Sequence, residues 1–322
     1  NEIIRVVRQD SINFVVYGNI LPPLLFELTQ AFAQIKIPTI CDIQDYYPTS
    51  ATGYIAKPES FVGKTLEGLF KVMVDHVIAR ATVVTTPGIA LALYAKRMAP
   101  RKPIYIIPNG ISEHFLDVYV NDGIKVRERL GFNQSDFVVG YIGSVEFWLD
   151  MEPLIKAIAE VNRKGKNVKF LIIGRQLQSK YAESLSRWLK MYGVSRYTQW
   201  LDFVPQQEVP LYVAAIDLGT VPFNIYNPTA YYAAPNKIWE YLSQGTEVVA
   251  TPMPEALLYR NIIKIAITWE QYTGIILNTP IANPLQRLEK RRKIDYILKG
   301  RTWERSAQKM KYLITKLARR SV

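Results

Sequence analysis

The chain alternates short apolar runs with longer segments of helical periodicity. The short runs are uninterrupted and rich in β-branched residues, as in strands that are covered on both faces of a sheet. Between them, apolar residues recur every three or four positions, which is typical of amphipathic helices. We therefore predict an α/β protein in which βαβ units build parallel sheets. The predicted strands are 14–18, 38–43, 83–87, 104–108, 137–143, 169–174, 217–223 and 247–252.

The predicted helices lie between these strands and after the last of them. Gly193 and Gly245 follow two helical segments, where a left-handed glycine commonly ends a helix. A final helix is predicted after Thr302, with Glu304 in its first turn. Its apolar stripe, which would dock on the protein body, is Trp303, Ala307, Met310, Ile314 and Leu317. The other predicted helices are 24–35, 62–81, 152–165, 181–193 and 236–245.

The length of 322 residues indicates two domains, at roughly 100–200 residues each. The polar, turn-rich section 109–135 separates two blocks of strands, so we place the crossover between domains there. We predict a first domain over 1–115, onto which 302–322 packs back, and a second over 116–301. The chain begins with Asn and enters a strand almost directly, which we interpret as the loss of its natural start.

Composition excludes several classes of protein. The content of 49% hydrophobic and 21% charged residues is that of a globular protein, and no uninterrupted apolar run reaches the ~18 residues of a membrane-spanning helix. Cys41 is the only cysteine, which rules out an intrachain disulfide and favours a reducing compartment. Cys41, His76 and His114 are too few for a His/Cys metal site or a cysteine protease, and we interpret both histidines as structural. No signal peptide is visible.

The net charge of +12 is concentrated near the C-terminus. Between Arg287 and Val322, thirteen Lys and Arg residues face only three acids. Such a block is typical of a surface for a polyanion or for anionic lipid. The alternative is an ordinary solvated helix face.

Candidate chemistry lies where the predicted strands end, because ligands of α/β sheets bind beyond the carboxyl ends of the strands. Gly143 and Ser144 end one strand and lead toward a helix, an arrangement that lets a phosphate approach the backbone. Arg175 follows Gly174 at the end of another strand, where a guanidinium can bind a phosphate. The alternatives are a glycine turn without a ligand and a surface arginine paired with an acid.

The segment 235–245 is the most informative. Asn236 and Lys237 would occupy the first turn of a helix, and Glu240 lies one turn further on nearly the same face. A lysine that reaches a diphosphate and a glutamate that accepts from ribose hydroxyls would together bind a nucleotide diphosphate. The alternative is a surface Lys–Glu pair.

Asp42 and Asp45 follow the strand 38–43. Two acids at a strand end can bind hydroxyls or serve as a base, and the alternative is a pair of loop-capping aspartates.

Several of these segments, taken in order, resemble one family. IYIIPNGIS, VVGYIGS, KFLIIG, FVPQQEVPLYVAAIDLGTVPF, PNKIWEYLSQGTEVVATP and TWERSAQKM resemble the successive motifs of GT-B fold glycosyltransferases, in particular of the large retaining family numbered four. The resemblance spans about residues 13–320. It implies two Rossmann-like domains that face a cleft, an N-terminal domain that lacks its first βα units, and a C-terminal helix that crosses back.

The resemblance also implies roles for individual residues. Lys237 and Arg175 would contact the donor diphosphate, and Asp45 would lie on the acceptor side of the cleft; these three are the predicted catalytic residues. Glu240 would hold the ribose. Other predicted donor contacts are Gly143, Ser144, Phe203 and Val204, with Asn236 beside Lys237.

The chain departs from the family pattern at two places. Tyr232 stands eight positions before Glu240, where the family has an acid. The basic pair that usually follows the glycine turn is missing, with Ser144 and the run 148–150 near its place, and Lys237 would substitute for one of its charges.

The resemblance predicts a retaining, metal-independent glycosyltransferase that needs no cofactor besides its nucleotide diphosphate sugar donor. The acceptor would be lipid-linked or a glycan, and the basic segment 287–322 would attach the protein peripherally to the cytoplasmic face of a membrane. The first alternative is a non-catalytic subunit that binds nucleotide sugar or only a protein. Two further alternatives are a nucleotide-sugar epimerase, which would need more acids and histidines, and a nucleic-acid binder. We predict no nucleic-acid partner, because no base-reading motif is present.

Overall fold

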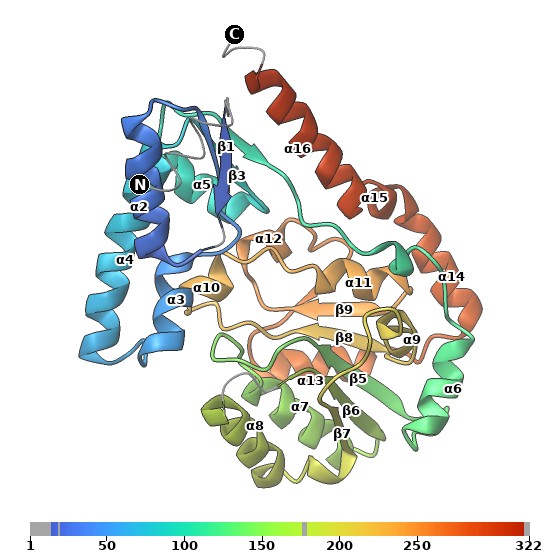
Figure 1. Cartoon of the computed structure of the whole chain (residues 1–322). Coiled ribbons are helices and arrows are strands. Elements are labelled where there is room, and N and C mark those ends of the chain that lie inside the picture. The colour runs from blue at the N-terminus through green and yellow to red at the C-terminus, as the bar shows by residue number, and fades with distance from the viewer. Residues whose placement is uncertain (1–13, 19, 176–178, 319–322) are drawn as a thin grey trace. The chain divides into compact units, whose positions relative to one another are not determined.

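The computed structural model describes residues 14–18, 20–175 and 179–318, which contain two parallel sheets (Figure 1). The α/β fold class is confirmed. The chain divides into two compact units, each described by itself below. Unit 1 comprises Asn1–Asn109, Tyr226–Ala234 and Glu304–Val322, and unit 2 comprises Gly110–Ile225 and Pro235–Trp303.

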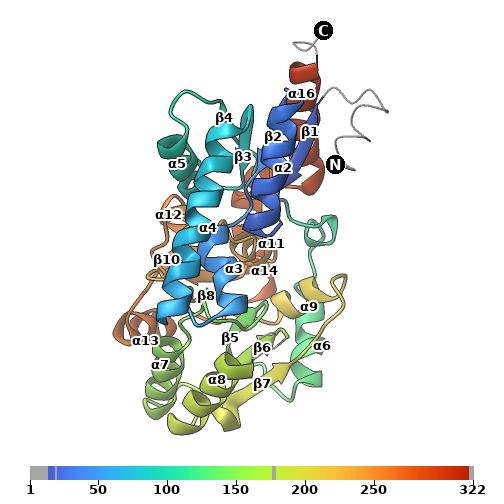
Figure 2. The same ribbon diagram turned by 60° about the vertical axis from the view of Figure 1, so that its left-hand side comes forward.

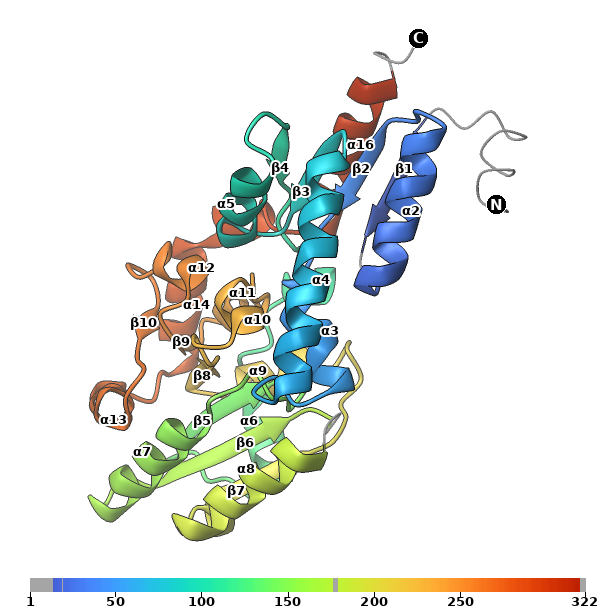
Figure 3. The same cartoon turned by 90° about the vertical axis from the view of Figure 1, so that its left-hand side faces the viewer.

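The sheet of unit 1 has four parallel strands in the order β1-β2-β3-β4. Because the order follows the chain, right-handed crossovers place α2, α4 and α5 on the same face, which Figure 3 shows. The strands are β1 (Val15–Gly18), β2 (Thr39–Asp42), β3 (Val83–Thr86) and β4 (Ile104–Ile106). The helices are α2 (Pro22–Gln34), α3 (Tyr47–Ile55), α4 (Phe61–Arg80), α5 (Ile89–Met98), α10 (Pro228–Tyr231) and α16, which begins at Trp303 in unit 2 and runs to Ala318.

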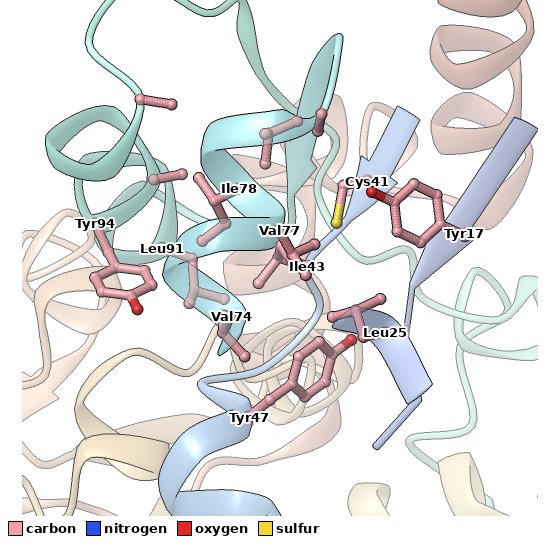
Figure 4. Packing of buried hydrophobic residues seen from close by; sticks show 14 of the residues in the cluster. Tyr17, Leu25, Cys41, Ile43, Tyr47, Val74, Val77, Ile78, Leu91 and Tyr94 are labelled. Carbon is pink, nitrogen blue, oxygen red and sulfur yellow. The ribbon is translucent and has the colours of Figure 1, made fainter. Parts of the chain in front are cut away.

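Alternation along the strands builds a core on each face of this sheet. Cys41 and Val84 point toward the helices on one face, where they join Tyr17, Leu25 and Val77 (Figure 4). Burial raises the pKa of the Cys41 thiol, so this cysteine stays protonated in the core.

The opposite face of the sheet packs against α16. Ile40 and Val83 contact Leu313, and Ile314 and Leu317 pack beside them. The predicted docking of the last helix is thus observed, but its predicted stripe is wrong at the N-terminal end. Trp303 is 52% exposed and Ala307 is exposed, because Ser306 and Leu313 take the buried positions.

The sheet of unit 2 has six parallel strands in the order β10-β9-β8-β5-β6-β7. Helices α7, α8 and α13 pack together, and α6, α9, α11, α14 and α15 form a second group (Figure 1). The strands are β5 (Phe137–Ile142), β6 (Val168–Ile173), β7 (Thr198–Leu201), β8 (Leu218–Val221), β9 (Glu247–Ala250) and β10 (Lys264–Ile265). The helices are α6 (Asp122–Arg129), α7 (Glu152–Arg163), α8 (Ser179–Met191), α9 (Val209–Ala214), α11 (Lys237–Ser243), α12 (Pro254–Leu257), α13 (Trp269–Asn278), α14 (Pro284–Lys293) and α15 (Asp295–Lys299), with 3-10 turns at Glu113–Phe115 and Ser195–Tyr197.

All eight predicted strands are present, and Gly193 and Gly245 adopt the predicted left-handed conformation, with φ of 69° and 67°. Two strands, β7 and β10, were not predicted. The segment 226–234 belongs to unit 1 although it lies within the sequence of the second predicted domain.

Candidate functional site

The candidate site lies at the point where the strand order of unit 2 reverses. From β5 the chain proceeds through β6 to β7 on one side, whereas β8, β9 and β10 extend the sheet on the other. Crossovers that leave in opposite directions open a crevice beyond the carboxyl ends of the strands, where ligands of such sheets bind. Gly143 follows β5 at this point, and helix α11 connects β8 to β9 beside it.

Gly143 and Lys237 form the centre of the site. Gly143 has φ of 146°, and a methyl group placed on it would lie 2.1 Å from Lys237 Cε and 2.6 Å from Lys237 Nζ. The lysine ammonium therefore lies in the space that any other residue at 143 would fill. This contact brings a cation to the carboxyl end of β5.

Tyr241 fixes α11 against the sheet and so positions Lys237. The Tyr241 hydroxyl accepts a hydrogen bond from Ile142 N at 2.9 Å, at the last residue of β5. Its ring lies on Gly219 of β8, where a methyl group would come within 2.3 Å of the ring. The role of Tyr241 was not predicted, because an aromatic residue in an amphipathic helix reads as ordinary core.

Glu240 lies one turn from Lys237 on the same helix and is half-buried. Burial raises the pKa of its carboxyl, and the nearby Lys237 ammonium partly opposes this shift. Among the described residues, no hydrogen bond or ion pair to the Glu240 carboxylate is present. The carboxylate oxygens are thus available to accept hydrogen bonds from a ligand.

The end of β6 supplies the second basic group. A methyl group on Gly174 would lie 1.8 Å from Gly143 O, so this glycine permits the two strand ends to approach. Trp200 Nε1 donates to Gly174 O at 3.2 Å and fixes the turn. The Arg175 guanidinium, which is exposed, lies over the ring of Phe203 at 5.0 Å.

The remaining predicted donor contacts have different surroundings. Phe203 is 63% exposed, whereas Val204 is buried. Ser144 is half-buried beside Gly143, and its carbonyl accepts from Tyr141 Oη at 2.7 Å. The Asn236 side chain donates to Gly110 O at 3.0 Å, which ties the start of α11 to the linker.

The helix that follows the glycine turn, α7, begins at Glu152, where the sequence predicts it. The loop 144–151 separates it from Gly143. The first turn of α7 carries the Glu152 carboxylate, which accepts from Tyr192 Oη at 2.9 Å. Helix α11 adjoins Gly143 through Lys237, whereas the start of α7 carries a carboxylate.

The two predicted aspartates lie in unit 1. Asp42 accepts hydrogen bonds from Thr85 Oγ1 at 2.6 Å and Gln44 Nε2 at 2.7 Å, so it caps the loop as in the alternative interpretation. Asp45 is half-buried and lines a cavity of about 430 Å³ whose other walls are mostly apolar. Asp45 is therefore the aspartate that adjoins a cavity.

Tyr232 belongs to the core of unit 1. Its ring stacks on Tyr46 at 4.8 Å with an interplanar angle of 19°, and Tyr94 lies at 5.6 Å. Burial raises the pKa of Tyr46 to about 12, so this hydroxyl stays neutral at physiological pH. The position that holds an acid in the resembled family is occupied here by a packing residue.

The basic C-terminal segment is partly structural. Arg287 and Arg291 are buried, and Arg287 binds Asp217 at 2.9 Å while Arg291 pairs with Asp295. Lys290 and Lys299 also hold acids. The expectation that the whole block faces a polyanion is therefore wrong for Arg287 and Arg291, whereas the charges of Lys290 and Lys299 are partly neutralised by their acids. Other exposed cations of the segment are Arg292, Lys293, Arg305, Lys309, Lys311 and Lys316, whereas Arg319 and Arg320 lie outside the described residues.

Two kinds of feature are absent from the described residues. No cluster of three or more His, Cys, Asp or Glu side chains is arranged to hold a metal ion. No described helix combines the length and the apolar character that crossing a membrane requires.

Comparison with known proteins supports the resemblance. Residues 136–265 match the family described as Glycosyl transferases group 1. The 2-deoxystreptamine glucosyltransferase of Streptomyces kanamyceticus is 22% identical over 52% of this chain and 43% of its own. The D-inositol 3-phosphate glycosyltransferase of Segniliparus rotundus is 29% identical over 54% of this chain and 37% of its own. The chain thus spans less than half the length of these relatives.

Solved structures share the fold. The Anabaena protein HepE, in complex with UDP and glucose, aligns with a TM-score of 0.73 at 18% identity over 98% of this chain and 82% of its own. The sucrose-phosphate synthase of Thermosynechococcus elongatus aligns with a TM-score of 0.66 at 17% identity over 92% of this chain and 78% of its own. The chain therefore has the GT-B fold, and its residues 136–265 are similar to the group 1 glycosyl transferases.

Proposed function

We propose that the protein is a glycosyltransferase that moves a sugar from a nucleotide diphosphate sugar to an acceptor, with retention and without a metal ion. The observation that carries this proposal is the Lys237 ammonium against Gly143, at the carboxyl end of β5 where the strand order reverses. A cation held at this point of a parallel sheet suits the diphosphate of a nucleotide.

The surrounding residues suggest how the donor would bind. Lys237 and Arg175 would neutralise the charge that develops as the diphosphate departs, which is how such sites lower a barrier. Glu240, whose carboxylate holds no described partner, would accept from the ribose hydroxyls. Phe203 offers an exposed ring for stacking a base, with Arg175 beside it. The HepE structure contains UDP, so uridine nucleotides are the first to test.

The finer parts of the proposal rest on chemistry and resemblance. Two side-chain cations at the donor site would supply the positive charge that metal-dependent enzymes take from an ion, which supports metal independence. Retention follows from the resemblance to family four. Asp45, beside a largely apolar cavity, supports an acceptor with an apolar part, such as a lipid-linked sugar, although a glycan acceptor fits the same assignment.

The protein would act at the cytoplasmic face of a membrane to which it binds peripherally. The exposed cations of the C-terminal segment support this, although fewer are available than the sequence predicts. Each basic side chain near an anionic bilayer contributes about 1 kcal/mol of binding free energy.

A second candidate is a non-catalytic subunit that binds nucleotide sugar for a partner. It is favoured by Tyr232, which packs on Tyr46 in unit 1 where the resembled family has an acid. Such a subunit would bind the donor without transferring or hydrolysing its sugar.

The decisive test is thermal stabilisation by UDP, GDP, ADP and their sugars. A ligand at 100 times its Kd should stabilise the protein by about 2.7 kcal/mol. Lys237→Met and Glu240→Gln should each weaken binding of the active nucleotide about tenfold or more, because each removes a charge-assisted contact. Lys190→Met and Glu183→Gln, which change exposed residues of α8, are the matched controls. Equal shifts in all five proteins would refute the donor site.

The pKa shift of Glu240 adds a pH dependence to this test. Its carboxyl has a folded pKa above the ordinary 4.5, so it takes up its proton at a higher pH than an exposed glutamate does. As pH falls through that raised pKa, the protonated carboxyl accepts ribose hydroxyls less well and the affinity should decline. Glu240→Gln should abolish this part of the pH profile.

Product analysis separates the two candidate functions. Incubation with the active donor and with candidate acceptors should yield a product of unchanged anomeric configuration by NMR, in the presence of EDTA. Donor binding without hydrolysis or transfer would favour the subunit. An inverted product or a loss of activity in EDTA would contradict retention or metal independence, respectively.

A further inference from the structure

The turn that joins α3 to α4 exposes an unusual group of large apolar side chains. We call residues 54–64 the hairpin tip. Phe61 is 86% exposed, Ile55 and Val62 are each 59% exposed, and Tyr54 is 58% exposed. Helices α3 and α4 pack side by side, with the tip at their shared end (Figure 2).

The exposure follows from a well-built turn. Ser60 Oγ donates to Lys57 O at 2.7 Å and accepts from Gly63 N at 3.0 Å, so it caps the start of α4. A methyl group on Gly63 would lie 2.0 Å from Lys57 O, which shows how closely the backbone on the two sides of the turn packs. The backbone of the tip is thus fixed by specific contacts that direct Phe61 and Val62 into solvent.

The tip is also remote from the core of its own unit. Helix α4 has 20 residues, which at 1.5 Å per residue makes it about 30 Å long. Its core contacts begin at Phe70 and continue through Val74, Val77 and Ile78. None of the four apolar tip residues belongs to a described core cluster. Contiguous exposed apolar groups of this kind mark an interaction site.

Charge and residue type indicate what covers the tip. Lys57 and Lys64 are exposed on either side of Phe61, and Glu59 is the single acid of the tip. Apolar side chains flanked by lysines suit the surface of an anionic bilayer, where the apolar groups reach the acyl chains and the lysines meet the headgroups. The amphipathic ring of Tyr54 suits the boundary between headgroups and acyl chains.

The apolar surface continues from the tip into a cavity. Tyr54 also lines the cavity of about 430 Å³ at Asp45, together with Leu21 and Leu24, which are 60% and 52% exposed. We propose that the hairpin tip inserts into the surface of an anionic bilayer and so brings this cavity to a lipid-anchored acceptor. The role of the cavity rests on the proposed function, whereas insertion of the tip does not.

Co-sedimentation of the full chain with vesicles of phosphatidylcholine and phosphatidylglycerol tests the proposal. The double variant Phe61→Ser, Val62→Ser should lower the partition coefficient at least tenfold, because it removes the apolar groups that enter the bilayer. Leu69→Ser with Val72→Ser is the matched control, since both residues are exposed further along α4 and should leave binding unchanged. Lys57→Gln with Lys64→Gln should weaken binding to these vesicles more than to pure phosphatidylcholine.

A second readout does not depend on loss of binding. Phe61→Trp should show a blue shift of tryptophan fluorescence on vesicle addition and quenching by brominated lipid, relative to the wild-type background. Equal partitioning of the two serine double variants, or no spectral change at position 61, would overturn the proposal. So would a concentration-dependent dimer that only the tip variant dissociates, because the tip would then be a protein interface.

The failure of this proposal can be told apart from failure of the proposed function. Nucleotide-induced thermal shifts measured on the same preparations should be the same in the tip variants and the wild type. A tip variant that keeps vesicle binding but loses the nucleotide shift would assign the tip to the donor site. Vesicle binding that depends on the tip in a chain without any nucleotide shift would leave insertion established and the glycosyltransferase proposal refuted.

Discussion

At the scale of single residues, Gly143 and Lys237 depend on each other. The glycine has a backbone conformation that side chains disfavour, and it leaves room for an ammonium that would collide with any Cβ. The Lys237 side chain is held at the end of β5, whereas the side chain of a fully exposed lysine would move among several rotamers. The pair therefore holds a charge in place before a ligand arrives, which lowers the cost of binding an anion.

Gly143→Ala tests this dependence. The added methyl would lie 2.1 Å from Lys237 Cε, so the lysine must leave its position, and donor affinity should fall about tenfold or more with the loss of a charge-assisted contact. Left-handed strain should also lower the free energy of unfolding by about 1–3 kcal/mol. Calorimetric titration and urea unfolding measure the two effects.

Gly165→Ala is the control for that experiment. Gly165 also has a positive φ, of 90°, but nothing lies within 4 Å of an added methyl. It should lose stability through strain and keep its donor affinity. If both alanine variants bind the donor like the wild type, Lys237 does not act from its observed position.

Spacing predicted some residues of the site and missed others for a physical reason. Lys237 and Glu240 are identifiable because charged residues one helical turn apart share a face. Tyr241 and Trp200 hold the same site together through side-chain hydrogen bonds to the backbone. An apolar pattern does not distinguish such a residue from ordinary core, so their roles needed coordinates.

At the scale of elements, burial explains which strands of unit 2 could be predicted. The eight predicted strands include β5, β6 and β8, whose residues are buried almost throughout and form continuous apolar runs. The missed strands β7 and β10 lie at the two edges of their sheet and are only half-buried. An edge strand does not need a continuous apolar run. The sequence TQWL of β7 and the two residues of β10 therefore show no clear strand pattern.

A buried charge network joins three elements of unit 2. Asp217, at the start of β8, accepts from Arg127 of α6 at 2.7 Å and from Arg287 of α14 at 2.9 Å. All three side chains are at least 95% buried, and burial lowers the pKa of Arg287 while Asp217 opposes the shift. The network fixes the beginning of the basic segment to the sheet.

Removal of one cation from this network should be costly. Arg287→Met should lower the free energy of unfolding by about 3–5 kcal/mol, because it leaves part of a buried carboxylate without its partner. Urea unfolding followed by circular dichroism measures the effect. Arg292→Met, an exposed arginine on the same helix, should change stability by no more than about 0.5 kcal/mol. Equal unfolding curves for the two variants would show that the network contributes no net stability.

At the scale of the whole molecule, the chain passes between its units more often than the sequence predicts. The prediction placed one crossover near 109–135 and one return at 302. The structure adds the segment Tyr226–Ala234, which joins unit 1 through the stacking of Tyr232 on Tyr46. These rings are 186 positions apart in the sequence, and no local pattern indicates such a pairing.

The basic residues that give the net charge of +12 are not all available at the surface, because several of them pair with acids of the same chain. Arg287 and Arg291 serve the interior, and Lys290 and Lys299 are held by acids, so a count of charges overstates the cationic surface. Membrane attachment by the remainder would be electrostatic and long-ranged. Attachment by the hairpin tip would be apolar and short-ranged. The two contributions therefore differ in their response to salt.

Salt dependence should separate them. The Debye length falls from about 14 Å at about 0.05 M salt to about 4 Å at about 0.5 M. Arg292→Gln with Lys293→Gln should weaken binding to anionic vesicles by about 2 kcal/mol at the lower salt concentration and have little effect at the higher one. The tip variant Phe61→Ser, Val62→Ser should show its defect at both concentrations, because burial of apolar surface does not depend on counterions. If the binding defect of the basic-segment variant persisted at high salt, attachment by that segment would not be electrostatic. If high salt removed the binding defect of the tip variant, attachment by the tip would not be apolar.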